Sequence, residues 1–113
     1  MIIKNLTKKK EISKDAEICS SVLSKFIGLM FSAEPKALVF RFDKEQNISL
    51  HMLFVFYPID VLFLDNKKIV VDMKEDFRPF TFYKSMKKAM YAVEFPTGAI
   101  RKSKAMIGDK LLF

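Results

Sequence analysis

Three ionisable side chains that could do acid–base chemistry lie within apolar stretches of the sequence. His51 and Asp60 interrupt an almost unbroken apolar run at residues 50–64, and Glu94 stands near the end of another at residues 89–95. Histidine titrates closest to neutral pH, and a nearby carboxylate can orient it or share its proton. His51 with Asp60 or Glu94 would therefore form an acid–base pair if the fold brings them within hydrogen-bonding reach.

Each of these side chains also has a structural interpretation. We expect Asp60 to be partly buried and therefore paired, either with Lys25 or with backbone amides, because an isolated buried carboxylate is very costly. Glu94 would either accept backbone amides at a helix start near Thr97 or face a pocket with His51. A lone histidine on a strand is more often a core or rim residue than a base. Lys25, His51, Asp60 and Glu94 are the candidate ligand-binding residues, and no catalytic set is assigned.

Other site chemistries are not indicated by the sequence. One cysteine and one histidine cannot supply a zinc quartet. We find no serine or cysteine nucleophile motif and no glycine loop that would cradle a phosphate. The sequence therefore predicts no metal site and no cofactor, and it leaves open whether the protein is an enzyme.

The apolar run at residues 50–64 predicts strands rather than a membrane span. A spanning helix needs about 20 apolar residues, whereas this run is shorter and contains Pro58 and Asp60. Phe, Val, Tyr and Ile dominate it and suit a pleated surface. We expect two consecutive strands with a break at residues 57–58, central in a sheet that is covered on both faces.

Periodicity predicts the remaining elements. Apolar residues at four-residue spacing indicate a short helix at residues 20–27, and Thr97 can cap a second one at residues 97–105. Alternation at residues 37–42 predicts a strand, and the turn cluster at residues 65–67 predicts a hairpin. We expect further strands at residues 1–6, 12–18, 68–73, 89–95 and 110–113, with residues 74–88 irregular.

Length and cysteine usage bound the kind of protein. A chain of 113 residues can bury enough surface to fold alone, so we expect one domain over residues 1–113. A single cysteine, Cys19, excludes an internal disulfide, and the first residues lack the basic-then-apolar layout of a secretory leader. Both features favour a reducing, cytoplasmic setting.

The basic charge does not by itself indicate a nucleic-acid binder. The formal net charge is +7, which attracts anionic partners. The basic residues form short separate clusters at residues 8–10, 84–88 and 101–104, and such runs are usually solvated surface. The phenylalanines lie mostly in apolar strands rather than beside the lysines, unlike the stacking platforms of single-strand binders. Nucleic acid is therefore an alternative partner that we do not favour.

Four signatures in order resemble those of DUF192, a small prokaryotic family of unknown function. Residues 25–30 resemble its Arg-x-x-Gly-Leu-Met motif, and residues 51–54 fall where many members have a Trp-Met-Lys-Asn-Thr-like stretch. Residues 58–65 resemble Pro-Leu-Asp-(Ile/Val)-x-Phe-(Ile/Leu)-Asp, and residues 93–98 followed by 107–109 resemble Leu-Glu-(Leu/Val)-Pro-x-Gly and Gly-Asp. The resemblance implies a mostly β (β-rich α+β) domain, a compact jelly-roll-like sandwich or distorted barrel with one or two short helices. It implies no established activity.

The sequence departs from the family pattern at two places. Lys25 stands where an arginine is usual, which loses the planar bidentate fork that arginine offers a carboxylate. The polar Lys-Asn-Thr portion is replaced by Leu53, Phe54 and Val55. If that portion makes a ligand site in other members, this protein binds something different or nothing.

Three functional hypotheses follow. The favoured one is a non-enzymatic binding or accessory module for a small ligand or protein partner, with Lys25, His51, Asp60 and Glu94 lining the site. The second is a small hydrolase or isomerase using His51 with Asp60 or Glu94. The third is a weak nucleic-acid binder through surface lysines. We expect a monomer or a homodimer, since an exposed edge strand could pair with a second copy of the chain.

Overall fold

The computed structural model describes residues 1–19, 37–51 and 57–113, with Cys19 and His51 described by their backbone alone. The predicted helix at residues 20–27 and the first half of the central apolar run, residues 52–56, lie outside this range. The described elements are β1 (Ile3–Asn5), β2 (Lys10–Ser13), β3 (Glu17–Cys19), β4 (Leu38–Gln46), β5 (Ser49–His51), β6 (Ile59–Leu64), β7 (Val70–Phe77), β8 (Phe82–Lys84), β9 (Ala89–Pro96), α2 (Ala99–Ser103) and β10 (Leu111–Leu112).

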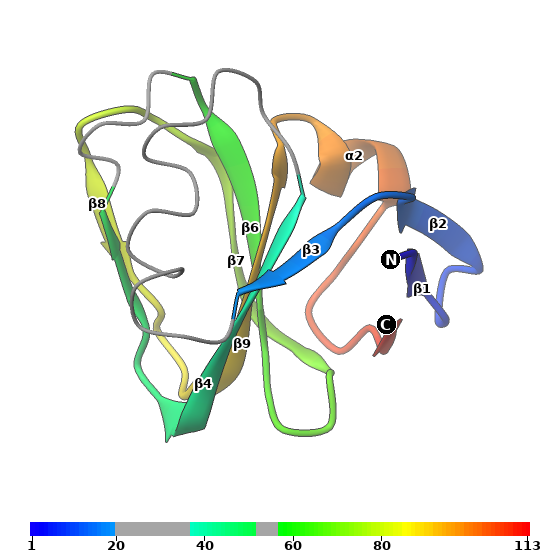
Figure 1. Ribbon diagram of the computed structural model, residues 1–113, viewed down its shortest axis with the longest axis horizontal. Helices are drawn as coiled ribbons and strands as arrows, with labels where there is room; N and C mark the ends of the chain where they lie inside the picture. The colour runs from blue at the N-terminus through cyan, green and yellow to red at the C-terminus, as the bar shows by residue number, and fades with distance from the viewer. Residues whose placement is uncertain (20–36, 52–56) are drawn as a thin grey trace.

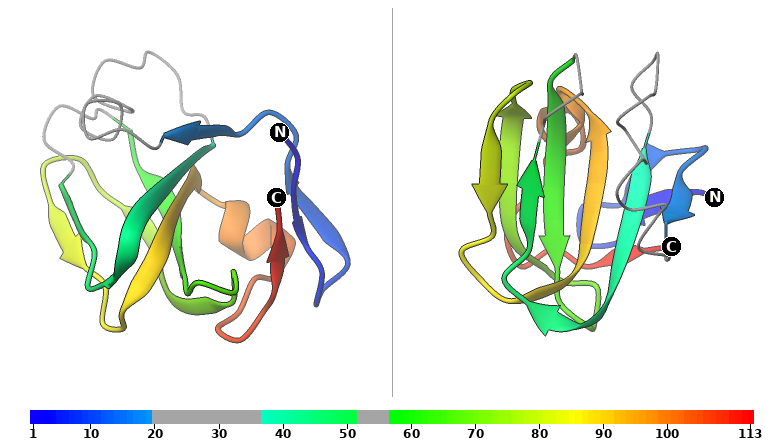
Figure 2. Two further views of the ribbon diagram at one scale, coloured as in Figure 1. Left: turned by 60° about the horizontal axis from the view of Figure 1, so that its bottom comes forward. Right: turned by 60° about the vertical axis from the view of Figure 1, so that its left-hand side comes forward.

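These elements form layers on both sides of one central sheet. The central sheet has the order β3-β4-β9-β6-β7, and all its neighbours are antiparallel except the parallel pair β3 and β4. The two-stranded β5-β8 sheet covers one face, while α2 and the three-stranded sheet β10-β1-β2 cover the other (Figures 1 and 2). We call these the β5-β8 face and the α2 face. This arrangement confirms a mostly β domain with a short helix.

Strand β6 is the centre of the molecule because both of its faces are packed. All six of its residues are buried, and it pairs with β7 and β9. Ile59, Val61 and Phe63 join the core cluster under β5 and β8. Leu62 and Leu64 join the cluster under α2 and β1. The prediction of a strand covered on both sides is therefore confirmed for this half of the run. Within the described residues, no helix is long and apolar enough to cross a membrane.

Several predicted elements are confirmed and others need correction. The hairpin through residues 65–67 joins β6 to β7, and Leu38 and Phe40 are buried in the core, with Phe42 packed against it. Residues 12–18 are not one extended piece, because β2 and β3 belong to different sheets. Residues 74–88 are not irregular throughout, since they contain the end of β7 and all of β8.

The barrel alternative is wrong for the part of the chain that the structure describes. The described strands form three separate sheets, and β3 and β7 are the open edges of the largest one. A barrel requires the first and last strands of one sheet to pair. Here the edges stay apart and the sheets pack on one another, which is the sandwich alternative.

Candidate functional site

Asp60 acts as a backbone cap inside the fold. It is 1% exposed and lies on β6. Its carboxylate accepts hydrogen bonds from the backbone amides of Gly98 and Ile100, both at 3.0 Å, and from the amide of Asp76 at 2.9 Å. The Thr97 hydroxyl donates to it at 3.4 Å. Capping of backbone amides, one of the two structural interpretations of Asp60, is therefore confirmed.

The start of α2 shows why this cap is needed. The sequence predicts Thr97 as the cap, but the N-cap position is Gly98, whose φ is 95° and which has no capping side chain. The first amides of a helix have no partner within the helix. Asp60 reaches them from the neighbouring strand, so the sequence-based assignment of Thr97 as the cap is wrong. The third amide, that of Asp76, lies where the pairing register of β6 and β7 shifts. The Asp60 carboxylate therefore links this part of β7 to the start of α2.

Glu94 lies on the opposite face of the same sheet. Strand partners share a face, and Glu94 is paired with Leu38 on β4 and Val61 on β6. Both partners belong to the core cluster under β5 and β8. Asp60 is instead paired with Phe95, which belongs to the cluster under α2. The structure therefore separates Asp60 from Glu94 by the thickness of the sheet.

The Glu94 carboxyl is buried, and its Oε2 atom lacks a donor within the described part of the chain. The residue is 5% exposed, and no donor among the described residues reaches its Oε2 atom. Burial raises the pKa of Glu94 to about 8, because a low-dielectric surrounding disfavours the charged form. Near neutral pH the group is mostly a neutral carboxylic acid, which can donate one hydrogen bond and accept others. The amides at the start of α2, one of the two predicted sets of partners for Glu94, are bound by Asp60 instead.

The other two candidate residues are only partly placed. His51 ends β5, and its backbone partner is Phe82 on β8. Its strand therefore lies on the Glu94 side of the central sheet, away from Asp60. Lys25 lies outside the described residues. Of the four candidates, the structure places Glu94 and the backbone of His51 on one side and Asp60 on the other.

Sequence reasoning missed a second buried carboxylate on the Glu94 side. Asp72 on β7 is 7% exposed and accepts the Tyr83 hydroxyl and the Met86 amide, each at 2.8 Å. Burial, together with the hydrogen bond to Asp72 and its charge, raises the pKa of Tyr83 to about 12. No local pattern indicates this contact, because β7 and β8 belong to different sheets, which pack on one another only in the folded chain.

A fourth buried carboxyl group, that of Asp109, joins the two ends of the described chain. Asp109 accepts Asn5 Nδ2 at 2.8 Å, Lys8 Nζ at 2.9 Å and the Met106 amide at 3.0 Å. Burial alone would raise the pKa of Asp109, but these hydrogen bonds and the charge of Lys8 outweigh it and lower the pKa. The sequence predicts only a turn at this position. Asp60, Asp72 and Asp109 are thus held by donors, and within the described residues no group of three potential ligands could hold a metal ion.

A shallow groove of about 430 Å³ opens between the β2–β3 connection and the end of β9. Its lining comprises Ile12, Ser13, Lys14, Asp15, Ala37, Phe95 and Pro96. Phe95 and Ala37 belong to the core cluster under α2. The groove therefore lies on the α2 side of the sheet and is not the space that Glu94 faces.

The sequence profile of DUF192, described only as "Uncharacterized ACR", matches residues 3–113. The chain belongs to the DUF192 family. An uncharacterised UPF0127 protein of Pyrococcus furiosus is 38% identical over 109 residues, which cover 95% of this chain and 93% of that protein. A UPF0127 protein of Pyrococcus abyssi is 33% identical over 112 residues, covering 97% and 95%. These relatives confirm the resemblance drawn from the four signatures and assign no activity.

Two crystal structures share the fold of this DUF192 member. A Novosphingobium aromaticivorans protein of unknown function has a TM-score of 0.86 at 16% identity, covering 99% of this chain and 82% of that one. A Sinorhizobium meliloti protein named as a candidate transcription regulator has a TM-score of 0.85 at 18% identity, covering 98% and 89%. At this identity the likeness shows the fold alone.

Proposed function

We propose that this DUF192 protein is a non-enzymatic binding module for a small ligand, with Glu94 as the polar anchor of its site. The observation that carries the proposal is the Glu94 carboxyl, buried on an apolar sheet face with no donor to Oε2 among the described residues. An unsatisfied buried polar group costs about 1–3 kcal/mol. A bound molecule with a hydrogen-bonding group would remove that cost.

The surroundings of Glu94 indicate the class of ligand. Its strand partners Leu38 and Val61 are apolar, and so is Ile59, which belongs to the same core cluster. Ligand sites are typically apolar with a few placed polar groups. The ligand we propose has an apolar body and one hydroxyl, amide or amine that hydrogen bonds to the Glu94 carboxyl. Glu94 lies two residues before the exposed Pro96, so the end of β9 is the proposed side of entry.

The geometry favours binding over acid–base catalysis. A His51–Asp60 pair receives no support, because Asp60 lies on the α2 face and its carboxylate is occupied by three backbone amides. A neutral carboxyl at position 94 suits recognition at neutral pH, since it both donates and accepts a hydrogen bond. Of the sequence-predicted ligand residues, the proposal therefore retains Glu94, with His51 on β5 in the sheet that covers this face.

The test is a methyl NMR screen of the complete chain against neutral and amine-bearing small molecules. We expect hits to shift the methyl signals of Leu38, Ile59 and Val61 together. Glu94→Met should weaken binding of these hits by about tenfold, because it keeps the length of the side chain but has no group that can hydrogen bond to the ligand. Glu45→Met makes the same chemical change at an exposed position of β4 and should leave binding unchanged.

Two results would contradict the proposal. Hits that shift only the groove around Phe95 would place the site on the α2 face instead. Hits that bind Glu94→Met as tightly as the unchanged protein would show that Glu94 is not the anchor.

A further inference from the structure

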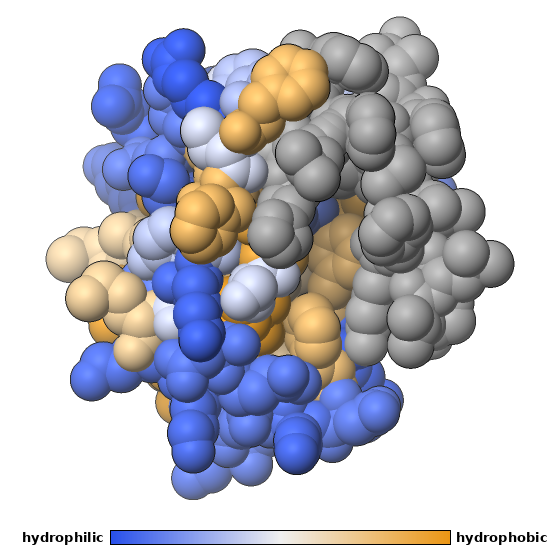
Figure 3. All heavy atoms as spheres, turned by 90° about the vertical axis from the view of Figure 1, so that its left-hand side faces the viewer, coloured by the Kyte–Doolittle hydropathy of each residue, from blue (hydrophilic) through white to orange (hydrophobic). Residues whose placement is uncertain are grey.

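A row of exposed side chains follows the outer face of β8. Phe80, Phe82 and Met86 are 63%, 70% and 79% exposed, and Lys84 between them is also exposed. Tyr83, which alternates with them, packs against the core. We call Phe80, Phe82, Lys84 and Met86 the β8 stripe. Figure 3 shows apolar side chains gathered on this side of the molecule with hydrophilic ones around them.

Basic residues extend the β8 stripe at both ends. Arg78 precedes it and is paired with Asp76 at 2.8 Å. Lys87 and Lys88 follow it and are exposed. Among the described residues, no ion pair neutralises Lys84, Lys87 or Lys88. The nearby Asp72 is buried and accepts hydrogen bonds from the Tyr83 hydroxyl and the Met86 amide instead. The stripe therefore combines aromatic rings with uncompensated positive charge.

The backbone before β8 holds one of these rings in a costly conformation. Phe80 has a φ of 64°, in the left-handed region that bulky residues rarely adopt. The Thr81 hydroxyl donates to the Arg78 carbonyl oxygen at 2.6 Å, which closes the turn around it. Such strain persists only where the surroundings impose it, and it concentrates at functional positions. Here it accompanies a phenylalanine ring that faces solvent.

We propose that the β8 stripe binds single-stranded nucleic acid. Phe80 and Phe82 stack on bases, and Lys84, Lys87 and Lys88 contact phosphates. Aromatic platforms flanked by cations are the arrangement used by proteins that bind single strands without sequence preference. From the sequence we expect the phenylalanines to lie mostly in apolar strands and not beside the lysines. Two of them do lie beside lysines on the surface.

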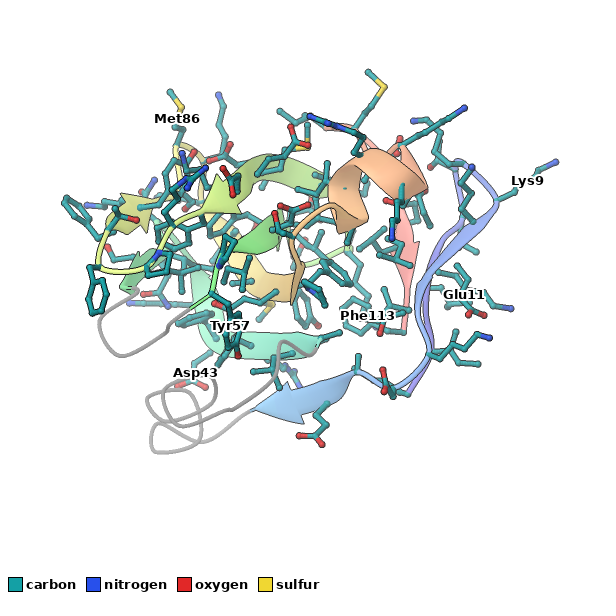
Figure 4. The ribbon with its side chains drawn as sticks, turned by 90° about the horizontal axis from the view of Figure 1, so that it is seen from above. Lys9, Glu11, Asp43, Tyr57, Met86 and Phe113 are labelled. Carbon is teal, nitrogen blue, oxygen red and sulfur yellow. The ribbon has the colours of Figure 1, made fainter. Side chains whose placement is uncertain are left out.

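This surface is separate from the proposed small-ligand site and from the other lysine clusters. The β8 stripe faces outward from β8, whereas Glu94 faces the inner side of the same layer. In Figure 4, Met86 and Lys9 project from opposite ends of the molecule, so the basic cluster at residues 8–10 does not extend the stripe. Failure of either proposal therefore leaves the other standing.

The test is fluorescence anisotropy of labelled oligothymidylate and oligouridylate titrated with the complete chain at low and at physiological salt. We expect binding at low salt that weakens as salt rises. Phe80→Ala with Phe82→Ala should weaken it about tenfold or more. Lys84→Gln with Lys87→Gln should lower the salt dependence, by about 0.7 in the log–log slope for each phosphate that the variant no longer neutralises. All four positions are exposed or half-buried at the surface, and circular dichroism checks that the variants fold.

Matched controls come from the opposite end of the molecule. Met106→Ala with Ile107→Ala removes apolar side chains that are 57% and 61% exposed, and Lys9→Gln with Lys10→Gln removes two charges. Neither pair should change binding. The proposal is overturned if no oligonucleotide binds at low salt, or if the phenylalanine variant binds as well as the unchanged chain. Binding to phosphatidylserine vesicles without binding to oligonucleotides would overturn it in favour of a membrane surface.

Discussion

Asp60 and Glu94 lie on adjacent strands of one sheet and are both buried, yet their surroundings differ completely. Asp60 faces α2 and accepts hydrogen bonds from three backbone amides. Glu94 faces the β5-β8 layer and meets apolar neighbours, with no donor to Oε2 among the described residues. We therefore expect the first carboxyl to stabilise the fold and the second to reduce its stability.

This difference shows how a sheet can divide structural and functional tasks between its faces. A carboxylate satisfied by backbone amides has no hydrogen-bonding capacity left for a ligand. A neutral acid in an apolar surrounding retains that capacity, and natural proteins accept its cost at functional positions. The contrast can be tested by removing each group in turn.

The largest effect should come from removing Asp60. Asp60→Ala leaves the amides of Asp76, Gly98 and Ile100 without their acceptor, so we expect a loss of about 4 kcal/mol in the free energy of unfolding. Urea titration followed by circular dichroism measures this loss. Asp65→Ala is the matched control, because Asp65 accepts two backbone amides in the hairpin turn, nearer to solvent. It should cost about 1 kcal/mol. A similar cost for both variants would show that burial does not distinguish them.

Removing Glu94 should have the opposite sign. Glu94→Met keeps the length of the side chain and removes the uncompensated carboxyl, so we expect stability at pH 7 to rise by about 2–3 kcal/mol. The measurement is again the free energy of unfolding in urea. Destabilisation by this variant would mean that the carboxyl is satisfied in solution, and the contrast with Asp60 would disappear.

The pH dependence of stability should sharpen the same contrast. The pKa of Glu94 rises from its ordinary value of 4.5 to about 8 in the folded protein. Between these values the folded state holds a proton that the unfolded state has lost, so stability falls as pH rises from about 4.5 to about 8. The Glu94 contribution to the slope is at most about 1.4 kcal/mol per pH unit. Comparing unfolding curves across this window, we expect Glu94→Gln to lack this part of the slope. An unchanged slope in the variant would assign the titration to another group.

The smallest effect concerns Asp72, a buried carboxylate that lies on the same face of the sheet as Glu94 but has hydrogen-bond donors. Tyr83→Phe removes the hydroxyl that donates to Asp72 and should cost about 1 kcal/mol. Tyr91→Phe is the control, because Tyr91 is also half-buried but makes no hydroxyl hydrogen bond among the described residues. Thermal unfolding compares the two. Equal melting temperatures would show that the Tyr83–Asp72 bond contributes nothing to stability.

Part of this arrangement could be predicted from local patterns. Alternation and β-branched composition located β6 and the strand β9, and the turn cluster after Leu64 located the β6–β7 hairpin. The cost of burying a lone carboxylate led to the expectation that Asp60 is paired, either with Lys25 or with backbone amides, and the structure shows the amides. Local rules assign the cap of α2 to Thr97, because they consider only residues near the helix terminus. The actual acceptor lies 38 residues from Gly98 and 40 from Ile100.

Local residue patterns were enough to predict most of the strands and the family, but they missed β8 and the break between β2 and β3. How the strands face one another depends on the three-dimensional packing. Alternation puts Asp60 on the same face of its strand as Leu62, and Glu94 on the same face as Ala92. It does not tell whether Asp60 and Glu94 point to the same face of the sheet once the two strands are paired. Their pairing in the register Asp60 to Phe95 sets the two carboxyls on opposite faces. A shift of one residue would have brought them together, so their environments depend on the packing of the whole sheet.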